Sequence, residues 1–177
     1  MPTDPARIDP IFAAFASVIQ PRSRIIDIGA GKGLLAQEMT RQLDARVIMV
    51  DVAQYNHTNL PLTVCDSRAL AFADNSFDHA LLSFVLHHSP HPEIILREAL
   101  RVAREVIVIE NDVRGAVTRL IDSWPAIRYG TPPCHLTRTR DEWLEWFEEF
   151  PVEARVLKEF ALERGFFQNL AVLLRKV

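Results

Sequence analysis

Short apolar runs alternate with amphipathic stretches along the first 110 residues of the chain. The runs are rich in β-branched residues and too short for core helices, so each predicts a buried strand. They cover residues 24–28, 46–50, 62–64, 77–84 and 105–110. Apolar residues recur at helical spacing over 10–20, 33–43 and 92–103, and Asp9 followed by Pro10 is typical of a helix start. Strands that alternate with helices predict a parallel sheet covered by helices on both faces.

This alternation ends after residue 110. Residues 111–138 are polar and contain prolines, and only 116–124 has a helix-like pattern. Beyond them, Thr139 and Glu142 have the spacing of a capping box, which predicts a helix that starts at Thr139 and runs to about Phe150. The aromatic residues of this helix are expected to pack in the core rather than to bind a ligand.

Two more strands are expected at the end of the chain, over residues 152–162 and 166–177. The link between them, around Gly165, is so short that the two strands must be antiparallel. No repeat, linker or low-complexity segment divides the sequence. The pattern therefore predicts a single α/β domain over residues 1–177.

Composition narrows the classes of partner. The chain has 177 residues, of which 49% are hydrophobic and 24% charged, as in an ordinary globular domain. The net charge of −3 gives no basic surface for nucleic acid or anionic lipid. Two cysteines make neither a disulfide framework nor a zinc site, and neither a signal peptide nor a membrane-spanning run is evident. We expect a cytoplasmic protein without a nucleic-acid or membrane partner; the oligomeric state is left open.

A glycine-rich loop links the first expected strand to its helix. It reads Asp-Ile-Gly-Ala-Gly-Lys-Gly over residues 27–33. Glycines let a ligand approach the backbone closely, and the N–H groups of the following helix start face that ligand. Asp51 ends the second strand, where a carboxylate can accept both hydroxyls of a ribose. These features predict a nucleoside-containing ligand at the carboxyl edge of the sheet.

The loop argues against a dinucleotide as that ligand. Leu34 stands where the dinucleotide fingerprint has its third glycine. The Asp27 carboxylate would repel a diphosphate, whereas it would attract an ammonium or sulfonium group. An amino-acid-bearing nucleoside is therefore favoured over NAD.

With these motifs, the chain resembles the class I S-adenosylmethionine-dependent methyltransferases over about residues 23–110. The resemblance implies a Rossmann-like, doubly wound, mostly parallel seven-stranded sheet with an antiparallel C-terminal strand pair, and S-adenosylmethionine as cofactor. It implies that the loop and its acid hold the methionine portion, that the second acid binds the ribose, and that the next residue packs on adenine. The segment after the third strand would read the adenine edge, and the serine ending the fourth strand would lie beside the methionine. The cofactor-binding residues so implied are Asp27, Gly29, Gly31, Asp51, Val52, Asp66, Ser67 and Ser83.

Several of these residues also have a purely structural interpretation. The glycines would permit a strand-to-helix turn without a ligand, Asp51 would serve as a surface acid, and Asp66 would begin a turn. His87, His88 and His91 lie close together, but no Cys, Asp or Glu completes a metal set at familiar spacing, so no metal is expected.

The methyl acceptor would be contacted by the N-terminal helix, the end of the fourth strand and the segment 111–138, which we expect to cover the substrate. His87, His88 and His135 are the candidates for a general base there. Enzymes that methylate the amino groups of nucleobases usually carry Asn/Asp-Pro-Pro-aromatic after the fourth strand, whereas residues 83–86 read Ser-Phe-Val-Leu. A small-molecule acceptor is therefore favoured. A non-catalytic binding protein, an NAD-dependent oxidoreductase and an RNA or protein methyltransferase remain as alternatives.

Overall fold

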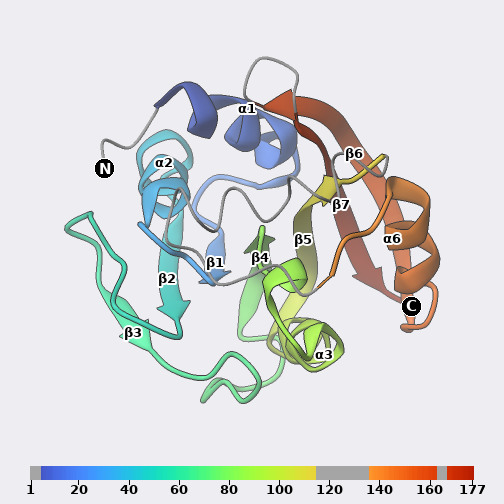
Figure 1. Cartoon of the computed structure of the whole chain (residues 1–177). Helices are drawn as coiled ribbons and strands as arrows, with labels where there is room; N and C mark the ends of the chain where they lie inside the picture. Colours follow the sequence, from blue (N-terminus) through green and yellow to red (C-terminus); the bar gives the residue numbers. More distant parts are fainter. Residues whose placement is uncertain (1–4, 115–135, 163–166) are drawn as a thin grey trace.

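The computed structural model describes residues 5–114, 136–162 and 167–177. Seven strands form one sheet in the order β3-β2-β1-β4-β5-β7-β6 (Figure 1). The strands are β1 (Arg24–Ile28), β2 (Arg46–Asp51), β3 (Leu62–Val64), β4 (Phe77–Ser83), β5 (Ala103–Asp112), β6 (Val152–Leu162) and β7 (Phe167–Lys176). The first five strands are parallel, and β7 runs antiparallel to both β5 and β6. The predicted Rossmann-like sheet with its antiparallel C-terminal pair is confirmed.

The strand order places a crevice where a ligand would be expected. From β1 the chain moves outward through β2 to β3, and then returns to β4 on the other side of β1. The connections leaving β1 and β4 therefore diverge at the carboxyl ends of these strands. Such a switch point is the usual ligand site of an open α/β sheet.

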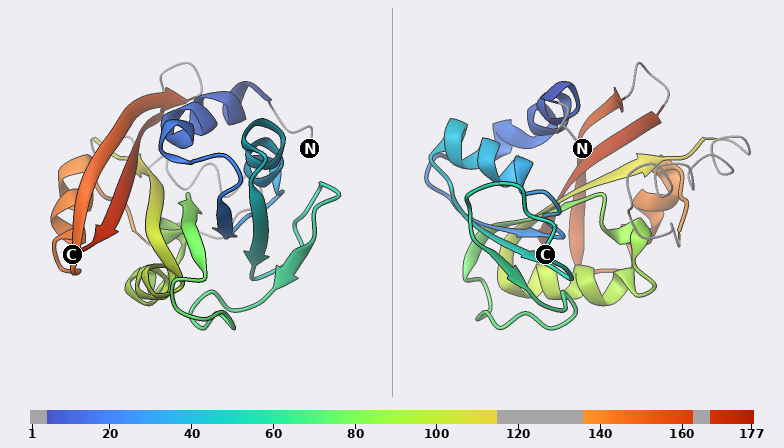
Figure 2. Two further views of the ribbon diagram at one scale, coloured as in Figure 1. Left: turned by 180° about the vertical axis from the view of Figure 1, so that it is seen from behind. Right: turned by 60° about the vertical axis from the view of Figure 1, so that its left-hand side comes forward.

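Helices cover both faces of the sheet (Figures 1 and 2). They are α1 (Pro5–Phe15), α2 (Leu34–Leu43), α3 (Pro92–Val102) and α6 (Arg140–Phe147). Helices α1 and α2 pack on one face, where Phe15 and Met39 meet Ile25. Helices α3 and α6 pack on the other, where Leu96 and Trp143 share a core with Ile26. Neighbouring residues of β1 thus point to opposite cores, as the pleat of a strand requires.

The start of the first helix differs from the prediction. It begins at Pro5, and Pro10 lies inside it rather than at its first position. A proline there costs one backbone hydrogen bond. The helix continues because Ile11, Phe12 and Phe15 are all buried against the sheet. Tertiary packing therefore overrides the local start signal.

The second half of the chain follows its predictions closely. Thr139 and Glu142 form the capping box, with each side chain accepting from the other residue's backbone N–H. Helix α6 ends at Phe147, three residues before the predicted end. Strand β5 is longer than predicted and continues to Asp112. The helix expected within 116–124 lies outside the described residues.

The edge of the sheet at β3 has little cover. The β2–β3 connection (residues 52–61) and the β3–β4 connection (residues 65–76) contain no helix. As a result, Ile48 and Val64 are exposed on β2 and β3. Among the helices that the structure describes, none is both long and apolar enough to cross a membrane.

Candidate functional site

The glycine loop turns at the carboxyl end of β1 and leaves open space beside Gly31. This residue has a φ of +54°, which favours glycine, and a Cβ added to it would meet no atom within 4 Å. A Cβ on Gly29 would instead lie 2.5 Å from Cγ2 of Val85, which follows β4. Gly29 is thus required for packing of the protein itself, whereas Gly31 borders space that a ligand can occupy.

Asp51 ties the end of β2 to this loop. Its carboxyl group is buried, and Oδ2 accepts a hydrogen bond from the backbone N–H of Gly31 at 2.8 Å. Gly29 and Ala30 also donate from their backbone nitrogens to the carbonyl oxygen of Val50, at 2.8 and 3.1 Å. The loop is therefore held in shape by β2, so a ligand would meet a preformed cradle.

Asp27 is a buried acid that lacks a hydrogen-bond donor among the described residues. Only 2% of its surface is exposed. Burial, and secondarily the negative charge of Asp51, raises the pKa of Asp27 to about 7. A cation placed beside these two carboxylates would stabilise the ionised form of Asp27. The pair therefore suits the ammonium group of an amino acid and disfavours a phosphate.

The affinity of the site for S-adenosylmethionine is expected to fall as the pH drops below about 7. The complex with an ammonium group favours ionised Asp27, so it holds fewer protons than the free protein, and raising the pH promotes binding. Above pH 7 the affinity should level off. Calorimetric titration over a pH series checks this, and Asp27→Asn should weaken binding and remove the pH dependence. A wild-type affinity that is constant through neutral pH would contradict the assignment of Asp27.

The residues expected around adenine gather at the same edge but differ in their contacts. The backbone nitrogen of Cys65 donates to the carbonyl oxygen of Asp51 at 2.9 Å, which brings the segment after β3 to the end of β2. The Asp66 carboxylate binds the side chain and backbone N–H of Arg68, and this lowers the pKa of Asp66 to about 2. Ser67 is buried and Val52 is 64% exposed.

Asp66 thus begins a turn, which was the structural interpretation considered for it from the sequence. The exposed side chain of Val52 leaves an apolar surface next to the ribose-binding candidate. Ser83 ends β4 level with the start of the glycine loop, since its neighbour Leu82 pairs with Ile28 of β1. The adenine contacts of Val52, Asp66 and Ser67 and the methionine-side place of Ser83 remain predictions.

The candidate catalytic histidines have very different surroundings. His87 lies in a short 3₁₀ turn (Leu86–His88), is buried, and its Nδ1 contacts the carboxylate of Glu110. His88 is partly buried, with its ring centroid 4.0 Å from that of His87. His91 is half exposed beside Glu93. His135 lies outside the described residues.

Glu110 is the site residue that the sequence analysis missed. It lies in β5, is 1% exposed, and also accepts a hydrogen bond from the backbone N–H of Leu86 at 2.8 Å. The sequence contained a signal for this residue. Glu110 follows the apolar run Val-Ile-Val-Ile, just as Asp51 follows the apolar run of the second strand. In the part of the chain that the structure describes, no three His, Cys, Asp or Glu side chains gather as a metal site.

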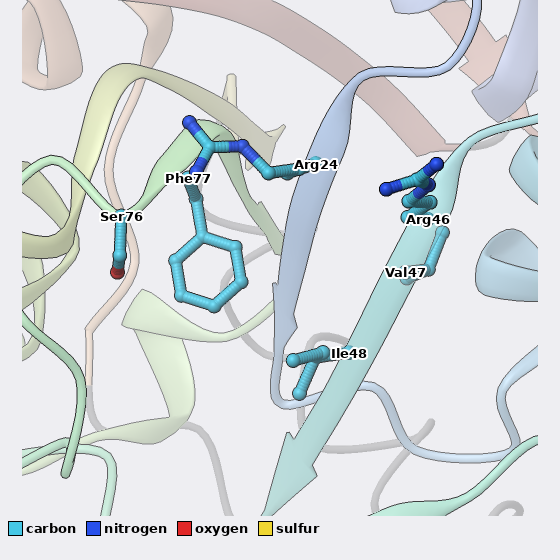
Figure 3. Close-up of a pocket in the computed structure, with 6 residues that line it drawn as sticks. All are labelled: Arg24, Arg46, Val47, Ile48, Ser76 and Phe77. Carbon is cyan, nitrogen blue, oxygen red and sulfur yellow. The ribbon is translucent and has the colours of Figure 1, made fainter.

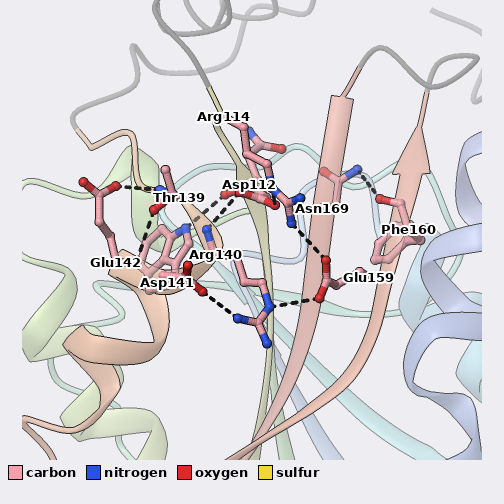
Figure 4. A network of polar contacts seen from close by, with 11 residues as sticks. Asp112, Arg114, Thr139, Arg140, Asp141, Glu142, Glu159, Phe160 and Asn169 are labelled. Carbon is pink, nitrogen blue, oxygen red and sulfur yellow. Dashed lines mark hydrogen bonds and ion pairs between the residues drawn. The ribbon is translucent and has the colours of Figure 1, made fainter.

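Two hollows elsewhere on the molecule are distinct from this site. A pocket of about 370 Å³ lies at the amino ends of the parallel strands, away from the glycine loop (Figure 3). Its lining residues are Arg24, Arg46, Val47, Ile48, Ser76 and Phe77. A second hollow, between the end of β5, the start of α6 and β6, is lined by an ion-pair network (Figure 4).

That network fastens α6 to the sheet. Buried Asp112 accepts from the backbone N–H of Arg140 at 2.9 Å and pairs with Arg114. Both arginines also bind Glu159 of β6, each at 2.9 Å. Asp112, a residue within the segment expected to cover the substrate, therefore has a structural role in joining three elements.

Known proteins resemble the part of the chain that carries the glycine loop. Residues 26–106 match the model of a methyltransferase domain. Demethylmenaquinone methyltransferase of Corynebacterium kroppenstedtii is 33% identical over 90 residues, covering 48% of this chain and 39% of the relative. The ubiquinone/menaquinone biosynthesis C-methyltransferase of Nitrosospira multiformis is 30% identical over 115 residues, covering 56% of this chain and 47% of the relative. The chain thus spans less than half the length of these relatives.

Solved structures agree on the fold over nearly the whole chain. A methyltransferase structure from Thermotoga maritima superposes with a TM-score of 0.74 at 16% sequence identity. The match covers 97% of this chain and 90% of that one. At such identity the likeness concerns the fold, while the matched domain model covers the glycine loop, the two acids and β4.

Proposed function

We propose that this chain is a class I S-adenosylmethionine-dependent methyltransferase whose carboxyl-edge site binds S-adenosylmethionine and transfers the methyl group to a small-molecule acceptor; the match of residues 26–106 to a methyltransferase domain supports this. The observation that carries this proposal is the placement of two buried acids around the open space at Gly31. Asp27 would face the ammonium group of the cofactor. Asp51 would accept the ribose hydroxyls while it holds the loop through Gly31.

These residues fit the cofactor for physical reasons. Asp27 is a buried carboxyl group without a described donor, so a cationic partner satisfies it. When bound, S-adenosylmethionine supplies an electrophilic methyl group on a sulfonium. The protein then contributes mainly orientation and exclusion of water, and good positioning can lower a barrier by roughly 7–11 kcal/mol.

The acceptor is proposed to be a small hydroxylated aromatic molecule, such as a quinol. The relatives are named for methylation of demethylmenaquinone and for ubiquinone/menaquinone biosynthesis. The Ser-Phe-Val-Leu sequence that begins at the last residue of β4 differs from the Asn/Asp-Pro-Pro-aromatic motif of enzymes that methylate nucleobase amino groups, which also supports a small molecule.

Calorimetry with S-adenosylmethionine, S-adenosylhomocysteine and NAD tests the cofactor. Micromolar binding of the first two without binding of NAD is expected. Transfer of a labelled methyl group to a reduced short-chain demethylmenaquinone then tests the acceptor. Binding of NAD alone would favour an oxidoreductase, and cofactor binding without transfer to any acceptor would favour a non-catalytic binding protein.

Asp51→Ala is expected to weaken S-adenosylmethionine binding by about 1–3 kcal/mol, roughly 5- to 150-fold, through loss of hydrogen bonds to the ribose. Loss of the anchor at Gly31 adds to the effect. The measurement is calorimetric affinity at fixed pH. As a matched control, Asp74→Ala removes an exposed acid that pairs with Arg101 and should leave the affinity unchanged. An unchanged affinity in Asp51→Ala would place the ribose elsewhere.

A further inference from the structure

A buried histidine–carboxylate pair lies at the carboxyl ends of β4 and β5. Nδ1 of His87 contacts Oε2 of Glu110, while Oε1 of Glu110 accepts from the backbone N–H of Leu86 at 2.8 Å. His87 is 5% exposed and Glu110 is 1% exposed. Both oxygens of the carboxylate therefore have a polar partner, and the carboxylate is fixed relative to the imidazole ring.

The pair borders the proposed cofactor site. The chain leaves β4 through Val85, whose side chain occupies the space over Gly29 of the glycine loop. Just before it, the backbone N–H of Phe84 donates to the carbonyl oxygen of Ile109 at 2.8 Å, next to Glu110. His87 thus comes two residues after a direct contact with the loop. His87 therefore lies on the segment that leaves β4 beside the glycine loop.

The carboxylate determines how the imidazole can react. A carboxylate beside Nδ1 favours the tautomer with the proton on Nδ1, which leaves the basic lone pair of the ring on Nε2. The negative charge of Glu110 then stabilises the imidazolium that forms. Among the described residues, the His88 and Phe84 rings contact the His87 ring, at 4.0 and 6.4 Å between centroids, and Arg138 interacts electrostatically with Glu110.

A second histidine–glutamate pair, on β4 and β5 themselves, provides an internal comparison. Nδ1 of His79 lies 3.3 Å from Oε2 of Glu105, at the amino ends of β4 and β5, but the contact lacks hydrogen-bond geometry. Glu105 is bound instead by Nε of Arg175 at 2.6 Å. Of these two histidine–glutamate pairs, the tightly bonded one is therefore the pair at the edge that carries the glycine loop.

We propose that His87 is the general base of the methyl transfer and that Glu110 is its positioning residue, which specifies an acceptor that must lose a hydroxyl proton. This inference rests on the proposed function. The O–H bond of the acceptor breaks and its proton goes to Nε2 of His87. The released electron pair, directly from oxygen or through the aromatic ring, forms the new bond to the methyl carbon, and the carbon–sulfur bond breaks with its electron pair on sulfur. For a ring-carbon acceptor, the displaced ring hydrogen leaves as a proton that restores the hydroxyl. His87 then gives its proton to water.

The first test uses the protein alone, without cofactor or acceptor. Nitrogen–proton correlation NMR of wild-type protein should show His87 as the Nδ1–H tautomer at high pH. In Glu110→Gln, the titration midpoint of the His87 ring should move to lower pH, because the neutral amide no longer stabilises the imidazolium. Glu105→Gln is the matched control and should leave that midpoint unchanged. An Nε2–H tautomer in wild-type protein would overturn the proposal even if no variant folds.

The second test follows turnover with S-adenosylmethionine and a reduced short-chain demethylmenaquinone. Glu110→Gln should lower kcat by roughly 10²-fold or more and shift the acid limb of its pH profile to lower pH. His87→Gln should remove that limb, whereas Glu105→Gln should behave as wild type. A purely structural role for Glu110 would lower activity without moving the limb, and that result would overturn the inference.

Cofactor binding separates failure of this inference from failure of the proposed function. If wild-type protein does not bind S-adenosylmethionine in calorimetry, the proposed function fails. If it binds the cofactor normally and Glu110→Gln keeps the wild-type kcat, His87 midpoint and pH profile, only the inference fails. Binding of the cofactor with transfer to a thiol or a neutral amine, but to no hydroxylated aromatic probe, would overturn the proposed acceptor class.

Discussion

Replacing Gly31 by valine is expected to weaken S-adenosylmethionine binding by more than roughly 100-fold, about 2.7 kcal/mol, while the protein remains folded. A Cβ at this position meets no protein atom within 4 Å, so the added side chain extends into the space proposed for the cofactor. The positive φ of Gly31 adds strain of about 1–3 kcal/mol for a branched residue, which a folded domain of ordinary stability tolerates. Calorimetry measures the affinity, and circular dichroism with urea unfolding measures the fold.

Gly29→Ala is the informative counterpart. Both glycines have positive φ, so the backbone strain is similar in kind, but a Cβ on Gly29 would lie 2.5 Å from Val85. This variant should therefore lose stability through a clash within the protein. If Gly31→Val folds and binds the cofactor as wild type does, the loop is not the cofactor loop.

Trp143→Ala is expected to lower the free energy of unfolding by about 3–5 kcal/mol, the usual cost of removing a large buried aromatic side chain. Trp143 is 1% exposed and its ring is stacked with that of Phe147, with 6.1 Å between centroids. Its Nε1 donates to the carbonyl oxygen of Asn111 at 3.0 Å, and Arg138 lies over its ring at 4.9 Å. The substitution leaves a cavity and removes the hydrogen bond to Asn111. Urea denaturation followed by circular dichroism gives the change.

Glu145→Ala on the same helix is the control for this variant. Glu145 is exposed, so its removal should change the free energy of unfolding by no more than about 0.5 kcal/mol. Similar losses in the two variants would mean that α6 is not anchored by the buried face. Because Trp143 and Arg138 lie next to β5, a large loss in Trp143→Ala should also disturb the surroundings of Glu110.

The part of the chain that resembles a cofactor-binding domain, about residues 23–110, was largely predictable because its sequence motifs are local. A glycine loop after an apolar run, and an acid at the end of the next run, specify a strand edge without knowledge of the strand order. Asp27 and Asp51 met as expected because the carboxyl ends of adjacent parallel strands lie at one edge of a sheet. The capping box of Thr139 was also predictable, since both of its partners lie within one helical turn.

Other features depended on contacts that no short pattern contains. The start of α1 at Pro5 was missed because burial of Phe12 and Phe15 outweighs the local signal at Pro10.

The sequence by itself thus determined the alternation of strands and helices, the glycine loop and the two acids that suit a sulfonium nucleoside. Only the tertiary structure decided that Asp27 is buried enough to titrate near neutral pH and that His87 meets Glu110. The physical reason is distance along the chain. Hydrophobic periodicity and turn chemistry act over a few residues, whereas burial and the pairing of His87 with Glu110 depend on β4 and β5 becoming neighbours in the sheet.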